Sequence, residues 1–164
     1  MSVILPVALR GEDILKLKAA HVADSEFKSE WLEQLALAMQ ATMSVRDGVG
    51  IAAPQVYISK RVIIVASRPN PRYPDAPEMD AVVMVNPEIL EFSQETCFGE
   101  EGCLSVPNER GLVERAQVVK VRYQTLKGEV VEAVYEGFPA RIVQHEVDHL
   151  DGVLFVERIS LSES

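Results

Sequence analysis

QHEVDHLDGVLF, the stretch from Gln144 to Phe155, predicts a helix that carries a metal site. It contains His145, Glu146 and His149 in an H-E-x-x-H spacing. Side chains four residues apart lie on one face of a helix, so the two imidazoles can bind one ion. Glu146, beside the first of them, can reach a water that the ion holds. Two buried imidazoles without partners would be costly, which favours a metal site over a chance match.

The third ligand has to come from outside this helix. In one large group of H-E-x-x-H proteins, a histidine stands three residues after a glycine that follows the motif. Here Gly152 is present, but Phe155 occupies the histidine position. His21 lies in no motif and is expected at the surface. Glu157 is too close in sequence to return to the site, and Glu163 stands near the end of the sequence.

The two cysteines are the remaining candidates, and Cys103 in EEGCLSVP is the better placed, because it stands before a predicted turn. A thiolate is a good ligand for Zn²⁺ or Fe²⁺. A closed structural zinc site would use Cys97, Cys103, His145 and His149, whereas an open site would leave Cys97 out and keep one position for water. Glu146 favours the open site, since a closed one has no use for an adjacent carboxylate. Cys97 is then expected to be a small buried apolar residue.

The composition is that of one globular domain. The chain has 164 residues, 48% of them hydrophobic and 25% charged. A net charge of −9 argues against a surface broadly adapted to nucleic acid or anionic lipid. Two cysteines are too few for a disulfide framework and fit a reducing compartment. No secretory signal or membrane-spanning stretch is recognisable, so we expect a cytoplasmic protein without membrane partners.

A helical pattern runs from about Glu26 to Arg46, with Asp24 or Ser25 as its N-cap. Asp47-Gly48 is expected to end this helix. Every fourth residue is apolar, and we expect these side chains to pack in the core: Phe27, Trp31, Leu35, Met39 and Met43.

Four segments predict strands, and the last of them is EVVEAVYE (129–136). RVIIVA (61–66) is rich in β-branched residues and predicts a buried strand. A loop with four prolines (67–80) separates it from a second strand, AVVMVN (81–86). Alternating side chains from Val119 to Gln124, followed by a Lys127-Gly128 turn, predict a hairpin.

The last helix follows this hairpin. Gly137 precedes it, Pro139 stands in its first turn, where a missing N–H costs little, and Gly152 suits its end. The fold class is therefore α+β, with mostly antiparallel strands and a final helix that bears the motif.

Three motifs stand in the order found in peptide deformylases: GVGIAAPQ (Gly48 to Gln55), EGCLS (Glu101 to Ser105) and QHEVDHLDG (Gln144 to Gly152). The sequence resembles this family over nearly its whole length. The triple match is specific, whereas H-E-x-x-H alone is shared with unrelated metallopeptidases. The resemblance implies a single catalytic domain over residues 1–164, with mixed, mostly antiparallel sheets around a central C-terminal helix.

The resemblance also implies a reaction, in which the formyl group of N-terminal formyl-methionine is removed from new polypeptides and released as formate. Glu146 matches the family's general acid/base, and Gln55 and the backbone N–H of Leu104 match its oxyanion donors. The family's preferred ion is Fe²⁺, and Zn²⁺, Ni²⁺ or Co²⁺ can occupy the site in preparations. The implied metal ligands are Cys103, His145 and His149.

Substrate-binding residues are expected around this centre. Gly48 and Gly50 lack side chains, so their loop can approach an extended peptide and pair with its backbone. Arg110 matches a residue of the family's substrate rim, and Glu101 and Arg115 match an ion pair that supports the strand of Cys103. Further candidates, mostly for the methionine pocket, are Val49, Ile51, Gly102, Phe138 and Ile142.

The expected partners are N-formyl-methionyl nascent peptides. Many bacterial relatives continue into a long basic C-terminal helix that contacts the ribosome, whereas this sequence stops at Ser164 without such an extension. We therefore expect weak ribosome binding and no direct contact with nucleic acid.

Two other functions share parts of this pattern. A metallopeptidase that cleaves internal peptide bonds would act on blocked internal peptides but not on formyl-Met-Ala. A structural zinc or peptide-binding domain would lose its metal equally when either cysteine is replaced.

Overall fold

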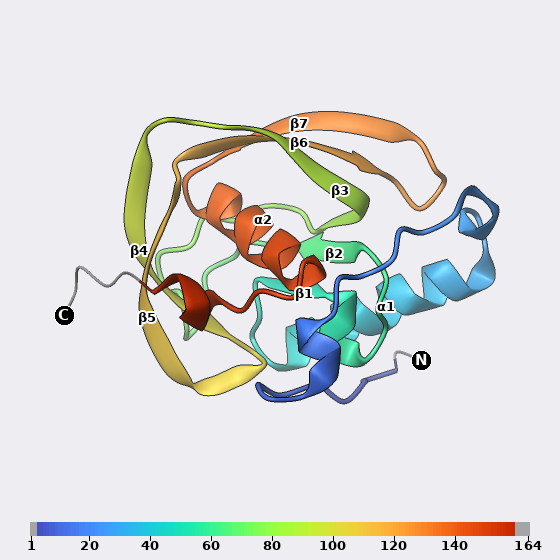
Figure 1. Ribbon diagram of the computed structural model, residues 1–164, viewed down its shortest axis with the longest axis horizontal. Helices are drawn as coiled ribbons and strands as arrows, with labels where there is room; N and C mark the ends of the chain where they lie inside the picture. Colours follow the sequence, from blue (N-terminus) through green and yellow to red (C-terminus); the bar gives the residue numbers. More distant parts are fainter. Residues whose placement is uncertain (1–2, 160–164) are drawn as a thin grey trace.

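The architecture is α+β, as predicted, and the computed structural model describes it over residues 3–159. Five strands form one antiparallel sheet in the order β1-β2-β3-β6-β7, and β4 and β5 form a second sheet. Figure 1 shows α2 in the middle of the molecule with strands of both sheets around it. The helices and strands are α1 (Glu30–Val45), β1 (Gly50–Ala52), β2 (Val62–Val65), β3 (Val82–Phe92), β4 (Thr96–Cys103), β5 (Val106–Ala116), β6 (Val118–Gln124), β7 (Val130–Glu136) and α2 (Gly137–Leu150).

Strand β2 is buried on both faces, as its β-branched sequence predicted. Ile63 and Val65 belong to a core cluster that includes α2 residues, whereas Val62 and Ile64 belong to a cluster that includes α1 residues. Side chains alternate across a strand, so this one strand joins the two helices into one core.

The α1 prediction was wrong at the N-terminus of the helix. Residues Asp24–Glu26 form a separate 3-10 turn, and Lys28 has a φ of 62°, a conformation that interrupts an α-helix. Ser29 is the N-cap, since its side chain accepts a hydrogen bond from the Leu32 N–H. Trp31 lies in the first turn and is 38% exposed, so it is not a core residue.

The rest of the α1 prediction is confirmed. Leu35, Met39 and Met43 are buried, and Phe27 packs against their cluster. The helix ends at Val45, and Asp47, rather than Gly48, has the positive φ that follows it.

Strands β6 and β7 form the predicted hairpin, with Val119 opposite Tyr135 and Gln124 opposite Val130. Gly128 in its turn has a φ of +87°. The chain then enters α2, which ends at Leu150 as expected. Gly152 has a φ of +78°, and a Cβ there would lie 2.5 Å from the Lys16 carbonyl oxygen. The N-terminal segment therefore packs directly on the end of the motif helix.

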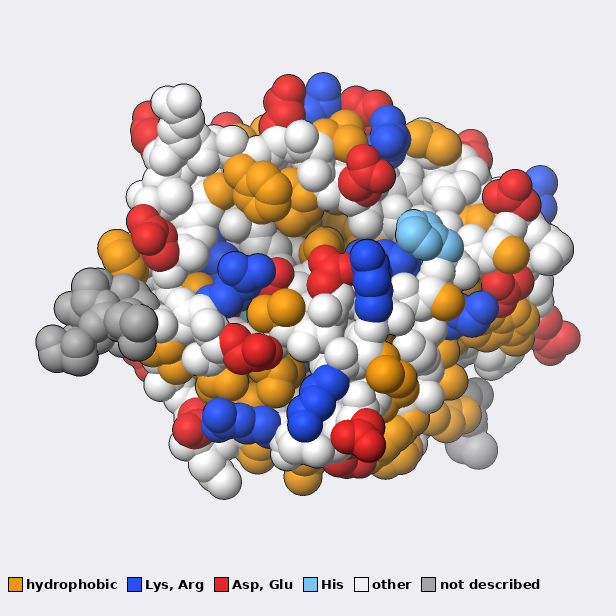
Figure 2. All heavy atoms as spheres, in the orientation of Figure 1, with side chains coloured by type: hydrophobic (Ala, Val, Ile, Leu, Met, Phe, Trp, Pro, Cys, Tyr) orange, Lys and Arg blue, Asp and Glu red, His pale blue; other side chains and the backbone are white. Residues whose placement is uncertain are grey.

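On the face in Figure 2, acidic and basic side chains are interspersed. Within residues 3–159, no helix combines the length and apolarity that a membrane crossing requires. Glu163 and the end of the sequence, where the ribosome expectation arose, lie outside the described residues.

Candidate active site

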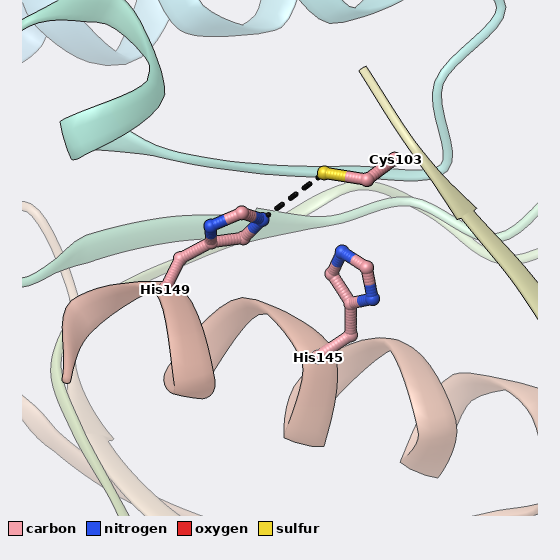
Figure 3. Close-up of side chains that lie close together, drawn as sticks. All are labelled: Cys103, His145 and His149. Carbon is pink, nitrogen blue, oxygen red and sulfur yellow. Dashed lines mark hydrogen bonds between the residues drawn. The ribbon is translucent and has the colours of Figure 1, made fainter. Parts of the chain in front are cut away.

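Helix α2 and the end of β4 bring together Cys103, His145 and His149 (Figure 3). Their candidate ligand atoms all lie within 4.8 Å of one another, and all three residues are buried. The Cys103 Sγ and His149 Nε2 atoms are 3.3 Å apart. Donor atoms of a tetrahedral zinc site are roughly 3.3–3.6 Å apart, given typical metal–ligand distances. The cluster therefore has the donor set and the spacing for one ion.

The protonation of these side chains also fits a metal. Although burial opposes ionisation, the pKa of Cys103 is held well below its ordinary value, because His149 and His145 lie beside it. The thiolate is the form that binds metals. His149 turns its Nε2 atom toward Cys103 Sγ, and its Nδ1 atom is buried without a hydrogen-bond partner within the described residues.

Glu101 orients His145. Its Oε1 atom lies 2.9 Å from His145 Nδ1, and a carboxylate can only accept, so the Nδ1 nitrogen carries the proton and Nε2 is left for a ligand bond. Arg115 donates two hydrogen bonds of 2.9 Å to Glu101, which confirms the ion pair that the sequence predicted. Arg141, which sequence reasoning missed, donates a third at 2.7 Å.

These contacts decide the charge of Glu101. Burial alone would raise its pKa, but the bonds from His145 and Arg115 hold the pKa of Glu101 far below its usual range. The ionised carboxylate is thus fixed by three donors at the back of the His145 ring.

Glu146 lies next to the cluster in a buried position. Burial raises the pKa of Glu146 to about 7, and its Oε1 atom has no hydrogen-bond partner among residues 3–159. Strand β1 passes very close, since a Cβ on Gly50 would lie 2.6 Å from Glu146 Oε2 and 2.8 Å from Ile142. Gly50 is therefore needed for the approach of β1 to α2, in addition to any role in peptide binding.

Gln55 and Leu104 flank Cys103. The Gln55 Oε1 atom accepts from the Ala52 N–H at 2.9 Å, which directs the Nε2 group toward Ser105 Oγ at 3.0 Å and Cys103 Sγ at 3.5 Å. Leu104 lies in the turn between β4 and β5, one residue after the thiol. Both residues line the same cavity as Glu146.

This cavity is bordered by residues of β1, β4 and α2 and of the turn between β4 and β5. Ile51 does not line it, because its side chain is fully buried in the core that includes α1 residues. Gly48 lies beside Leu104 rather than in the wall. Arg110 is on the outer side of Gly102. The predicted residues that do line the cavity, besides Cys103, His145, Glu146, Gln55 and Leu104, are Val49, Gly50, Gly102, Phe138 and Ile142.

The remaining candidates lie apart from the cluster. Cys97 is half-buried, and its carbonyl oxygen accepts from Arg141 at 2.9 Å, so it is a neighbour of the ion-pair network and not a buried apolar residue. His21 is exposed, as expected. Phe155 is buried and its ring stacks on His145, with centroids 6.0 Å apart. Two wall residues, Arg72 and Tyr73, come from the proline-containing loop and had no motif to indicate them.

A motif helix with two histidines, a buried glutamate and a cysteine from a neighbouring strand defines a metal-dependent hydrolase. The polypeptide deformylase model matches residues 4–164, and the chain belongs to this family. Members of the family remove the N-formyl group from nascent peptides. The fold and the reaction implied by the three sequence motifs are thereby confirmed.

Individual relatives agree with this assignment. Peptide deformylase 2 of Shewanella oneidensis is 50% identical over 159 residues, which is 97% of this chain and 86% of the relative. A crystal structure of the class I type b peptide deformylase from Acinetobacter baumannii with Met-Ala-Ser bound is 79% identical. The match covers 97% of this chain and 100% of the Acinetobacter chain, with a TM-score of 0.95. The peptide deformylase structure from Thermotoga maritima is 40% identical, covers 96% and 98% of the two chains, and has a TM-score of 0.83.

Proposed function

We propose that this chain removes the formyl group from the N-terminal formyl-methionine of newly made polypeptides through a centre in which Glu146 is the acid/base residue. The metal ligands in this proposal are Cys103, His145 and His149. The observation that carries it is the buried cluster of these three side chains, with donor atoms within 4.8 Å of one another, beside the buried Glu146 carboxylate.

A divalent ion bound there would lower the pKa of a water and polarise the formyl carbonyl. Glu146 accepts a proton from the attacking water and returns it to the leaving amine. Burial raises the pKa of Glu146, and an efficient acid/base group titrates near the working pH. Its unpartnered Oε1 atom is available for this proton transfer.

The developing oxyanion is stabilised by two donors in this proposal, the Gln55 amide and the Leu104 N–H. Gln55 is held in advance, since its carbonyl oxygen is bonded to the Ala52 N–H and its amide nitrogen lies near Cys103. Preorganised donors of this kind lower the barrier, because they need no reorganisation as charge develops.

We assign the methionine side chain to the apolar part of the cavity, formed by Val49, Phe138 and Ile142. The Acinetobacter baumannii relative, solved with Met-Ala-Ser, supports peptides that begin with methionine as ligands of this chain as well. Gly48, Gly50, Gly102 and Arg110 would border the peptide on either side. Ile51 would contribute only its backbone.

Several further assignments rest on the family resemblance alone. We propose Fe²⁺ as the ion in the cell, with Zn²⁺, Ni²⁺ or Co²⁺ able to replace it, because a His₂Cys donor set suits each of them. We also propose a single catalytic domain that acts on nascent chains in the cytoplasm.

The test is an anaerobic purification with metal analysis, followed by a formate-release assay on formyl-Met-Ala and on an N-blocked internal peptide. We expect about one ion per chain and formate from the first peptide only. Cleavage of the internal peptide without formate release would favour an endopeptidase. Metal without either activity would favour a structural or peptide-binding domain.

A further inference from the structure

One wall of the cavity comes from the loop that follows β2, through Arg72 and Tyr73. This loop is held in a defined shape. The Asn70 Oδ1 atom accepts from the Arg72 and Tyr73 N–H groups at 2.9 and 3.0 Å, and Ser67 closes the loop base through the Met79 N–H at 3.0 Å. Asn side chains commonly stabilise turns in this way. The position of Arg72 is therefore set by the fold.

Tyr73 fastens the loop to both elements of the centre. Its hydroxyl oxygen accepts from the Gly102 N–H at 2.9 Å, next to Cys103 on β4. Its ring packs on Phe138 of α2, with centroids 4.9 Å apart. The residue before it, Arg72, is thus placed where the cavity meets the surface.

Two guanidinium groups converge at this point. A Cβ on Gly102 would lie 2.9 Å from Arg72 Nη2 and 3.0 Å from Arg110 Nη1. The Arg110 guanidinium also stacks over the Tyr73 ring at 4.8 Å, and Arg72 lies 5.7 Å from the same ring. Arg72 lines the cavity and both hollows that adjoin it on the outside.

None of the carboxylates near Arg72 forms an ion pair with it. Arg110 is paired with Glu100 at 2.7 Å, and Glu109 is paired with Arg10. Glu101 is buried among Arg115, Arg141 and His145. Asp75 lines one of the adjoining hollows with Arg72 but lies beyond ion-pair distance from it. Within residues 3–159, Arg72 therefore has no ion pair, so a protein of net charge −9 carries an unpaired cation at the mouth of its cavity.

We propose that Arg72 is a specificity-determining residue, which favours formyl-methionyl peptides with a carboxylate side chain at the second or third position. This inference rests on the proposed function. A peptide whose methionine lies in the cavity has to leave it past Gly102, where the half-buried guanidinium can form a charge-assisted, bidentate bond to a carboxylate. An ion pair at a partly exposed site changes an equilibrium by about two- to fivefold.

The experiment uses the metal-loaded enzyme and peptides amidated at the C-terminus, which removes the terminal carboxylate. The series are formyl-Met-Xaa-Ser and formyl-Met-Ala-Xaa, with Glu, Gln or Lys at Xaa. We expect kcat/KM to be about two- to fivefold higher for Glu than for Gln at one position or both. The preference should shrink at about 0.5 M NaCl, because screening weakens exposed ion pairs.

The variants separate Arg72 from general charge effects. Arg72→Gln should bring the ratio of kcat/KM between the Glu and Gln peptides to about one. Arg72→Glu should make the Lys peptide the better substrate, by a similar factor. Arg68→Gln is the matched control, since Arg68 is exposed in the same loop and lines neither the cavity nor the adjoining hollows. It makes the same change in net charge and should keep the wild-type ratio.

Affinity for the corresponding peptides without the formyl group, measured by calorimetry, should follow the same order. This binding does not depend on catalysis, so it tests Arg72 even if the enzyme releases no formate. A lack of formate release would count against the proposed function alone. A wild-type Glu/Gln ratio of one at both positions, or a preference that survives in Arg72→Gln, would overturn the inference.

Discussion

The Nδ1 nitrogen of His145 donates a hydrogen bond of 2.9 Å to Oε1 of Glu101. The same carboxylate accepts from Arg115 and Arg141, so the orientation of a metal-site imidazole depends on two buried arginines. Such outer contacts fix the ring and its tautomer, and they contribute to metal affinity although they never touch the ion.

Glu101→Gln should therefore destabilise the protein strongly. The change removes the negative charge that both arginines share. Arg115 keeps Asp148 at 2.7 Å, but Arg141 is left buried without a carboxylate partner, which costs about 3–5 kcal/mol. Urea unfolding of the metal-loaded variant measures this loss. The rate of metal release to a chelator should also increase, by roughly 10- to 100-fold if affinity falls as for other outer-contact changes.

Glu100→Gln is the control for this change. Glu100 is the neighbouring residue and also pairs with an arginine, but its side chain is 59% exposed. Exposed pairs contribute about 0–1 kcal/mol, so its unfolding midpoint should stay near that of the wild type. Equal losses in the two variants would mean that Glu101 has no special part in the centre.

Replacing each cysteine separates the open site from the closed one. Cys103→Ala should strip the metal, because it removes one of three ligand atoms, whereas Cys97→Ala should leave the metal content unchanged. Metal analysis after dialysis gives the answer for both variants. Equal metal loss from the two would support a four-ligand site that includes Cys97.

The parts of this centre that the sequence predicts are those whose residues lie close together along the chain. The pair His145 and His149 is local, since helical periodicity alone places them on one face. Cys103 lies on another element, and it was identified by exclusion and by the family resemblance. Gly50 was predicted to approach a peptide, but the contact that requires a glycine is with Glu146, which only the packing of β1 on α2 reveals.

The contacts that the sequence did not predict are long-range ones. Arg141 and Cys97 meet only because the Arg141 side chain extends from α2 to β4, and no local pattern encodes that contact. Arg72 belongs to a loop whose sequence predicts only turns. The predicted start of α1 was wrong because Ser29, and not Asp24 or Ser25, is the N-cap of the helix. All three are equally good N-cap residues by type, so the sequence does not distinguish them.

Glu146→Gln should keep the metal and abolish formate release. The amide is of similar size but cannot take up the proton, and general acid/base groups contribute about 10²- to 10⁴-fold. The measurements are metal content and kcat on formyl-Met-Ala. Formate release within a fewfold of the wild type would remove Glu146 from its proposed role.

Gly50→Ala tests the position of Glu146 without changing its chemistry. A Cβ there would lie 2.6 Å from Glu146 Oε2 and 2.8 Å from Ile142, so β1 or the carboxylate has to move. We expect a loss of about 1–3 kcal/mol in stability, as for other overpacked sites, and a larger fall in kcat than in metal content.

Gly48→Ala is the comparison for this variant. A Cβ there would lie 3.0 Å from Met43 Cγ and 3.3 Å from Leu104 Cδ1, contacts that are less severe than those at Gly50 and do not involve Glu146. The fall in kcat should therefore be smaller than for Gly50→Ala. An equal fall in both variants would indicate a general requirement for a flexible loop instead of a contact with Glu146.

Phe155 stands where other H-E-x-x-H proteins place a third histidine, and here its buried ring stacks on His145 at 6.0 Å. Phe155→Ala should cost about 3–5 kcal/mol, because it leaves a cavity beside the metal site. Phe92→Ala is the control, since Phe92 is 60% exposed and its loss should stay within about 0.5 kcal/mol. Because the cavity frees one face of the His145 ring, metal release to a chelator should quicken in Phe155→Ala and not in Phe92→Ala. Destabilisation with unchanged metal release would restrict Phe155 to core packing, with no part in holding His145.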